Sequence, residues 1–238
     1  MLQDTYGHDR IQVIDNYAWR QGECGGQEGA VPPSVMLPVF LCVMVREMKR
    51  EFIEAIEASP VIAAVKNEAG LEHCLKSDVG VVFVLYGDVC SIADIVERIK
   101  EAGKTAVVHL DLIAGLSTRD AATDFIRQYT RADGIITTKS SLIAHANELG
   151  LGTICRYFIL DSMALETVGR ISFHGSARPD LIEILPGILA PKMIRQICDT
   201  ARLPVICGGL IKDREDTLNA LKSGASAIST TSENVWFM

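Results

Sequence analysis

Six residues whose side chains could do chemistry lie at or near the ends of short apolar runs in this sequence. Together they offer three cations, two carboxylates and one imidazole. Such a set could supply general acid–base chemistry or bind a small anion. The six are Lys66, His109, Asp111, Lys139, Arg156 and Glu183.

Each of these side chains also has a purely structural interpretation. His109 and Asp111 are two residues apart and so face the same way on a strand, where His109 could simply orient Asp111. Glu183 lies between Ile182 and Ile184 and could only neutralise Lys139 or Arg156. Lys139 could form a Schiff base, but its place at a helix start suits an anion site equally well.

A separate signal points to phosphate. Gly208-Gly209 follows the run 204–207, Thr230-Thr231-Ser232 follows the last run, and Leu185-Pro186-Gly187-Ile188 supplies another tight turn. Glycines let backbone N–H groups approach an anion, and hydroxyls add donors. The alternative is that these glycines only turn the chain.

The sequence lacks the motifs of several common nucleotide-binding and catalytic sites. The sequence contains no Walker loop, no Gly-x-Gly-x-x-Gly turn, no His-Glu-x-x-His and no Gly-x-Ser-x-Gly. His73, His145 and His174 lack ligand spacing, so we expect no metal and no cofactor.

Composition places the chain among globular proteins. It has 238 residues, of which 48% are hydrophobic and 22% charged, with a formal net charge of −7. The hydrophobic content excludes a disordered chain. The negative net charge argues against a protein that binds nucleic acid or membranes through its overall charge. No apolar run approaches the ~20 residues of a membrane span, and no secretory signal is visible. The seven cysteines include no Cys-x-x-Cys pair, so we expect reduced, buried thiols in a cytoplasmic protein.

The elements that must position these residues repeat every 20–28 residues. Short apolar runs predict eight strands, at 61–65, 81–85, 105–110, 134–138, 152–156, 181–185, 204–207 and 225–229. Amphipathic stretches predict helices at 91–102, 118–129, 140–149, 191–201 and 214–223. Ser91 and Ser140 fit N-caps, and Gly103, Gly150 and Gly224 fit the helix ends.

Eight such units favour an α/β fold, a (β/α)₈ TIM-type barrel with a short or missing last helix, over an open doubly wound sheet. Residues 48–238 would form this single barrel. In residues 1–47, Gly and Pro density predicts a disordered extension, or sequence before a native start at Met48. Trp236-Phe237 would pack against a barrel end or a subunit partner. In such a barrel the six polar residues and the phosphate turns would meet at the mouth, where the strands end.

Several segments of this chain resemble the bacterial glycerol-3-phosphate-responsive antiterminators, which regulate glycerol uptake operons. The resemblance runs from about Ser59 to Trp236. The segments that carry it are Ser59–Asn67, Val108–Gly115, Gly134–Ser140, Arg156–Asp161, Pro179–Gly187, Gly208-Gly209 and Thr230-Thr231-Ser232.

This resemblance implies a barrel that binds glycerol 3-phosphate and then acts on leader messenger RNA, causing transcription antitermination of glycerol genes. By carry-over, the phosphate would be held by Gly187, Gly208, Gly209, Thr231 and Ser232. Lys66, His109, Asp111, Lys139, Arg156 and Glu183 would line the polyol end or the pocket wall. Lys139 stands where related proteins can carry arginine, which keeps the charge and loses bidentate geometry.

Two functional hypotheses follow. The first is a ligand-sensing RNA regulator that forms a homo-oligomer; its RNA patch would use residues such as Lys192, Arg195, Lys212 and Arg214. The second is a barrel enzyme, an isomerase, epimerase or lyase, acting on a small phosphorylated metabolite. A barrel kept only for assembly is a third, weaker possibility.

Overall fold

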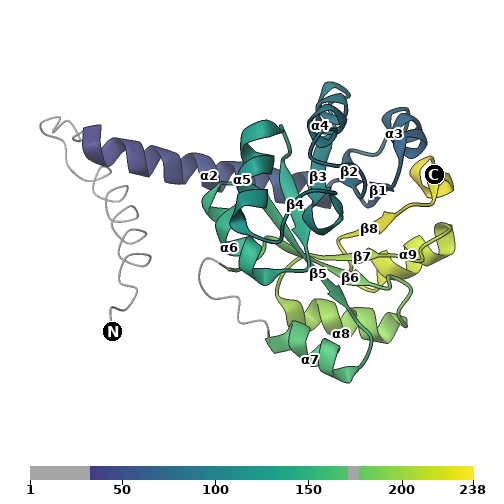
Figure 1. The fold of residues 1–238 in the computed structure, drawn as a ribbon. Helices are drawn as coiled ribbons and strands as arrows, with labels where there is room; N and C mark the ends of the chain where they lie inside the picture. The colour runs from purple at the N-terminus through teal and green to yellow at the C-terminus, as the bar shows by residue number, and fades with distance from the viewer. Residues whose placement is uncertain (1–32, 171–176) are drawn as a thin grey trace, which may run out of the picture. The chain divides into compact units, whose positions relative to one another are not determined.

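The computed structural model describes residues 33–170 and 177–238, in which eight parallel strands close into a barrel (Figure 1). Each strand pairs with the next along the chain, and β1 pairs with β8 through Val61 and Ile228. The predicted (β/α)₈ barrel is therefore confirmed, and the open doubly wound sheet is excluded. The strands are β1 (Val61–Val65), β2 (Val81–Val84), β3 (Thr105–His109), β4 (Gly134–Thr137), β5 (Gly152–Phe158), β6 (Leu181–Leu185), β7 (Val205–Gly208) and β8 (Ala227–Thr230).

Helices follow the strands and cover the outside of the barrel (Figure 1). They are α2 (Pro33–Glu57), α3 (Glu68–Leu75), α4 (Ile92–Glu101), α5 (Asp120–Tyr129), α6 (Ser140–Glu148), α7 (Ser162–Arg170), α8 (Pro191–Ala201), α9 (Arg214–Lys222) and α10 (Glu233–Trp236), with a 3₁₀ turn η1 at Leu110–Leu112. The last helix is short, as predicted. Trp236 is buried and donates its indole N–H to the carbonyl of Thr230, whereas Phe237 is exposed.

Helix ends agree in part with the sequence. Gly103, Gly150 and Gly224 follow helices with positive φ, the conformation that glycine adopts without strain. Ser91 holds the N-cap position of α4, but its side chain makes no capping bond to the helix. Ser140 is the first residue of α6, and Lys139 rather than Ser140 is the N-cap. The N-cap prediction for Ser140 is therefore wrong.

Glu47–Met238 form one compact unit, whose core lies in two layers. Side chains inside the barrel include Ile62, Phe83 and Ile136. Two further clusters fill the space between strands and helices, one around Val65, Ile99 and Leu142, the other around Ile184, Ile197 and Ile228. Strands that are buried on both faces explain the continuous apolar runs in the sequence.

The N-terminal end of the barrel is closed by the last turns of α2. Phe52 and Ile56 are almost fully buried and belong to the cluster inside the barrel. A Cβ atom at Gly152 would lie 2.4 Å from Cδ1 of Phe52, so the ring needs glycine there. Helix α2 begins at Pro33, which corrects the expectation that all of residues 1–47 lack regular structure; residues 1–32 lie outside the described residues.

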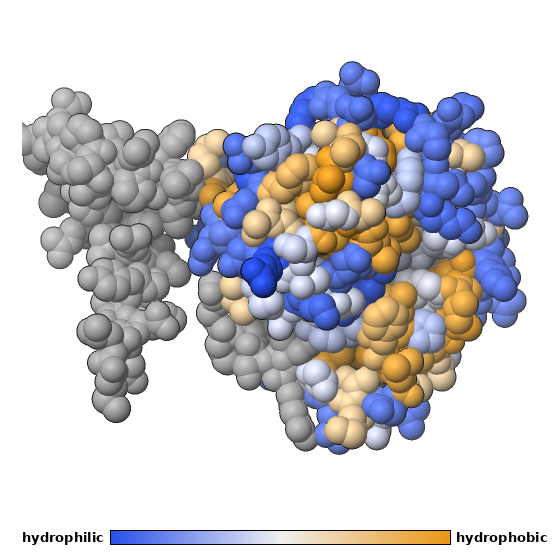
Figure 2. Space-filling view, in the orientation of Figure 1, coloured by the Kyte–Doolittle hydropathy of each residue, from blue (hydrophilic) through white to orange (hydrophobic). Residues whose placement is uncertain are grey.

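On the face shown in Figure 2, hydrophilic residues are interrupted by hydrophobic patches, several of them over α7 and α8. No helix in the described ranges combines the length and apolar character that a membrane crossing requires.

Candidate functional site

A cavity of about 370 Å³ opens at the carboxyl ends of the strands, on the side of β5 to β8. Five predicted site residues line it: Arg156, Glu183, Gly209, Thr231 and Ser232. The remaining lining residues are Ala64, Leu85, Leu185, Leu210, Ile211, Lys212, Ser229 and Thr230. Barrels of this type bind ligands at this end, because the βα loops gather there.

The floor of this cavity is a buried ion pair. The Nε of Arg156 on β5 lies 2.6 Å from Oε2 of Glu183 on β6, and their side chains are 10% and 1% exposed. Ser229 on β8 donates its hydroxyl to Oε1 of Glu183 at 2.5 Å. Both carboxylate oxygens are thus occupied, which a buried charge requires.

Gly208 is needed for packing beside this pair. A Cβ at this position would lie 2.4 Å from Oε1 of Glu183 and 2.6 Å from Oγ of Ser229. Gly208 does not itself line the cavity; its missing side chain makes room for the carboxylate.

The upper wall of the cavity carries groups suited to an anion. Gly209 has a φ of +75° and lines the cavity with Lys212, Thr231 and Ser232. Among the hydrogen bonds of the described residues, the backbone N–H groups of Gly209 and Thr231 have no acceptor. Gly187 differs, because its N–H donates to the carbonyl of Gly209 at 3.0 Å. Gly187 therefore positions the loop of Gly209 instead of offering its own N–H to a ligand.

His109 ends β3 and is only 2% exposed. Its Nδ1 is buried and has no hydrogen-bond partner among the described residues. Burial, together with the nearby charge of Arg156, lowers the pKa of His109 to about 4. The imidazole is therefore neutral at pH 7.

Asp111 does not share a strand face with His109, because β3 ends at His109 and Asp111 lies in η1. The expectation of a common strand face is therefore wrong. The Asp111 carboxylate accepts hydrogen bonds from Oγ1 of Thr137 and from the N–H and Oγ1 of Thr138. Burial alone would raise the pKa of Asp111, but these three hydrogen bonds hold it below its ordinary value. Asp111 thus ties η1 to the end of β4.

Lys66 and Lys139 are both exposed and do not line the cavity. They follow β1 and β4 respectively, so they lie at the mouth end of the barrel but outside its cavity.

Two polar lining residues were not predicted for this cavity: Ser229 was assigned no role from the sequence, and Lys212 was suggested for RNA. Ser229 alternates with the buried Ile228 on β8, which is a signal that a strand-by-strand reading could have used. Lys212 lies two residues beyond the Gly209-Leu210 turn, in a loop whose direction no periodicity predicts.

The four cations suggested for RNA, Lys192, Arg195, Lys212 and Arg214, are exposed near the starts of α8 and α9. Around the start of α9, however, they alternate with Asp213, Glu215 and Asp216. This end of the barrel therefore carries mixed charge instead of a purely basic patch.

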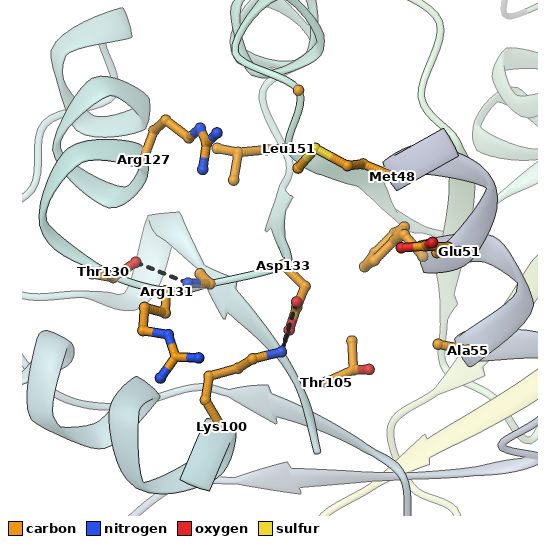
Figure 3. Close-up of a pocket in the computed structure, with 13 residues that line it drawn as sticks. Met48, Glu51, Ala55, Lys100, Thr105, Arg127, Thr130, Arg131, Asp133 and Leu151 are labelled. Carbon is orange, nitrogen blue, oxygen red and sulfur yellow. Dashed lines mark hydrogen bonds and ion pairs between the residues drawn. The ribbon is translucent and has the colours of Figure 1, made fainter. Parts of the chain in front are cut away.

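A second cavity, of about 570 Å³, lies at the opposite end of the barrel (Figure 3). Met48, Glu51 and Ala55 of α2 form one wall, and Arg127 and Arg131 face them across it. Lys100 and Asp133 point toward each other, with Nζ and Oδ2 separated by 2.7 Å. No predicted site residue lines this cavity. Arg127 and Arg131 are exposed, as expected for a solvated face.

The described cysteines are all free, and three of them, Cys74, Cys155 and Cys207, are buried as predicted. Cys90 is exposed and Cys198 is partly buried, which corrects the expectation for these two. Cys24 and Cys42 lie outside the residues whose side chains are described. Burial raises the pKa of the Cys207 thiol to about 12. The described residues contain no group of three or more His, Cys, Asp or Glu that could hold a metal ion.

A family model described as "Glycerol-3-phosphate responsive antiterminator" matches residues 61–236. The uncharacterized protein YgcP of Escherichia coli strain K12 is 41% identical over 184 residues, which is 77% of this chain and 95% of YgcP.

Two similar solved structures have related descriptions. A glycerol uptake operon antiterminator regulatory protein from Listeria monocytogenes is 32% identical, with a TM-score of 0.69 over 74% of this chain and 94% of that one. A glycerol uptake operon antiterminator-related protein from Thermotoga maritima is 33% identical, with a TM-score of 0.66 over 76% of this chain and 99% of that one. Several barrel enzymes less than 25% identical share the fold alone.

Proposed function

The chain belongs to the glycerol-3-phosphate responsive antiterminator family, and from this premise we propose that it binds glycerol 3-phosphate and acts on leader messenger RNA to suppress early transcription termination. The observation that carries the ligand is the cavity of about 370 Å³ at the mouth. Its size lies within the ~300–1,000 Å³ of small-molecule sites. It has anion-binding groups on one wall and a charged pair on the floor.

The phosphate would lie against Gly209, Thr231, Ser232 and Lys212. The N–H groups of Gly209 and Thr231, the Thr231 hydroxyl and the Lys212 ammonium group are the donors that a dianion needs. Ser232 would only line this wall, because its N–H donates to Oγ1 of Thr230 and its hydroxyl to the carbonyl of Lys212. Gly187 and Gly208 support this wall indirectly, the first through its bond to Gly209 and the second by making room for Glu183.

The glycerol end would lie over Arg156 and Glu183. A hydroxyl oxygen can accept a hydrogen bond from the Nη groups of Arg156, because Glu183 takes only the Nε of this guanidinium. His109, whose Nδ1 lacks a protein partner, lies near enough to Arg156 for their charges to interact. It would face the same end of the ligand.

RNA binding is tested by filter binding of the full chain to a hairpin leader of a glycerol gene, with and without glycerol 3-phosphate. We expect the ligand to change the RNA affinity of the wild type. Lys212→Ala should require more ligand for the same change, whereas Lys222→Ala, at the other end of α9, should match the wild type. RNA binding that ignores the ligand would contradict this function.

The buried imidazole of His109, close enough to the cavity residue Arg156 for their charges to interact, favours one second candidate, an enzyme acting on a small phosphorylated metabolite. The chemical step would need a group free to move a proton, whereas Glu183 and Asp111 are both fully hydrogen-bonded. Incubation with a panel of phosphosugars tests this candidate. Turnover that disappears in His109→Gln, while the variant stays folded, would favour the enzyme.

A further inference from the structure

We propose that the rim of the mouth around the starts of α8 and α9 is the surface on which a second copy of this chain docks, through a two-fold contact. The rim consists of the β5–α7, β6–α8 and β7–α9 loops. The proposal does not depend on the identity of the ligand. It assigns a specific face, next to the cavity, to self-association.

Large apolar side chains gather on this rim. Five of them are highly exposed: Phe158 51%, Leu160 83%, Met163 74%, Ile188 48% and Leu210 60%. Figure 2 shows hydrophobic residues over α8 and beside α9, bordered by hydrophilic ones. Single exposed apolar residues are normal, but a contiguous group marks an interaction site.

Hydrogen bonds join the three loops into one surface. The N–H of Ile159 donates to the carbonyl of Leu185 at 2.7 Å, which fixes the β5–α7 loop beside the end of β6. The N–H of Gly187 donates to the carbonyl of Gly209, which fixes the next two loops together. Ile188 and Leu210, the residues that follow these glycines, therefore lie on neighbouring loops.

Leu210 is held in an unusual conformation. It is one of two non-glycine residues in the described ranges with positive φ, here +64°, and its side chain is exposed. The left-handed region is strained for leucine, and such strain tends to persist at functional positions. A partner that covers Leu210 would remove its apolar side chain from water.

The charges around this surface are self-complementary. Lys192 and Arg195 at the start of α8 form no ion pair with any described residue. The start of α9 has two cations and three carboxylates, a net charge of −1: Lys212, Asp213, Arg214, Glu215 and Asp216.

Helices α8 and α9 are neighbours, so a two-fold axis between them would bring α8 of one copy onto α9 of the other. The same axis would bring Ile188 of one copy onto Leu210 of the other. A nucleic acid would instead bind a surface of purely positive charge, whereas this rim carries both positive and negative side chains.

The test is sedimentation velocity of the full chain over a range of concentrations. We expect a dimer in the wild type, and at least tenfold weaker association in Leu160→Glu/Met163→Glu. Both side chains are highly exposed, so the variant should fold normally. A control, Tyr129→Glu/Phe237→Glu, changes two aromatic residues outside the rim that are 60% and 59% exposed, and it should dimerise like the wild type.

A charge reversal tests the pairing of α8 with α9. Arg195→Glu should weaken the dimer, and adding Glu215→Lys in the same chain should restore it. A monomeric wild type, a dimer unchanged in the rim variant, or equal loss in the control would each overturn the proposal. If the wild type is monomeric and only the rim variant loses RNA binding, the face belongs to RNA and the second copy is excluded.

Discussion

Arg156 and Glu183 form the only ion pair of the described residues in which both side chains are at most a tenth exposed. Glu183→Gln keeps the shape but leaves the guanidinium without a counter-charge. Loss of one partner of a buried pair typically costs about 3–5 kcal/mol. We expect urea denaturation to show a loss of this order.

Glu97→Gln is the control, because Glu97 pairs with Arg131 on the surface, where an ion pair contributes about 0–1 kcal/mol. Equal effects of the two substitutions on the free energy of unfolding would show that the buried pair contributes no more than a surface pair.

The low pKa of His109 leads to a prediction about how the stability of the protein depends on pH. Its folded pKa of about 4 lies below the ~6.5 of an unfolded chain. Between these two pH values His109 is protonated in the unfolded chain but not in the folded chain. The free energy of unfolding therefore falls as the pH decreases from about 6.5 to about 4. His109→Gln should flatten this part of the profile, measured by urea denaturation at several pH values. A slope that persists unchanged in the variant would contradict the assignment.

The site could be predicted from the sequence only where strand position determines direction. Arg156 and Glu183 are register partners inside β5 and β6, and both line the cavity at the mouth. Lys66 and Lys139 come just after strands, where the chain turns and alternation no longer says which way a side chain points. The sequence also could not separate the roles of the glycines: in the structure Gly209 lines the cavity, whereas Gly187 supports it through a hydrogen bond to the Gly209 carbonyl.

The last turns of α2, which close the N-terminal end of the barrel, lead to a prediction about stability. Phe52→Ala should destabilise the chain by about 3–5 kcal/mol, since the ring fills the end of the barrel. Gly152→Ala should also destabilise it, because the three atoms nearest to a new Cβ all belong to the Phe52 ring.

The two substitutions should be strongly non-additive, because removal of the ring leaves room for the new methyl group. A double-mutant cycle in urea measures this coupling. Additive effects would mean that Phe52 does not pack on Gly152 in solution.

Elements with strong periodicity were predicted well, and those without it were not. All eight strands were located to within two residues, because buried parallel strands are continuous apolar runs. Helices α3 and α7 were missed. Helix α3 is short, contains Gly70 and has no strong apolar stripe. The start of α2 was not predicted, because residues 1–47 are rich in Gly and Pro, which favour irregular structure.

At the scale of the whole molecule, the repeat in the sequence predicts eight strand–helix units. It does not by itself show that the eight strands close into a barrel. The pattern of apolar residues describes each strand separately and does not indicate whether the last strand pairs with the first. The pairing of Val61 with Ile228 supplies that closure. It also brings β8 and its Thr231-Ser232 segment beside the loops of β6 and β7, and so completes the cavity.

The most direct test of the central claim is a thermal-shift titration of the full chain with glycerol 3-phosphate, beside glycerol and inorganic phosphate at equal ionic strength. A ligand at 100 times its Kd adds about 2.7 kcal/mol of stability, or roughly 5–10 °C in Tm for a domain of this size. We predict a saturable rise of this order for glycerol 3-phosphate and a much smaller one for either fragment. No rise at millimolar glycerol 3-phosphate, or the same rise with phosphate alone, would contradict the account.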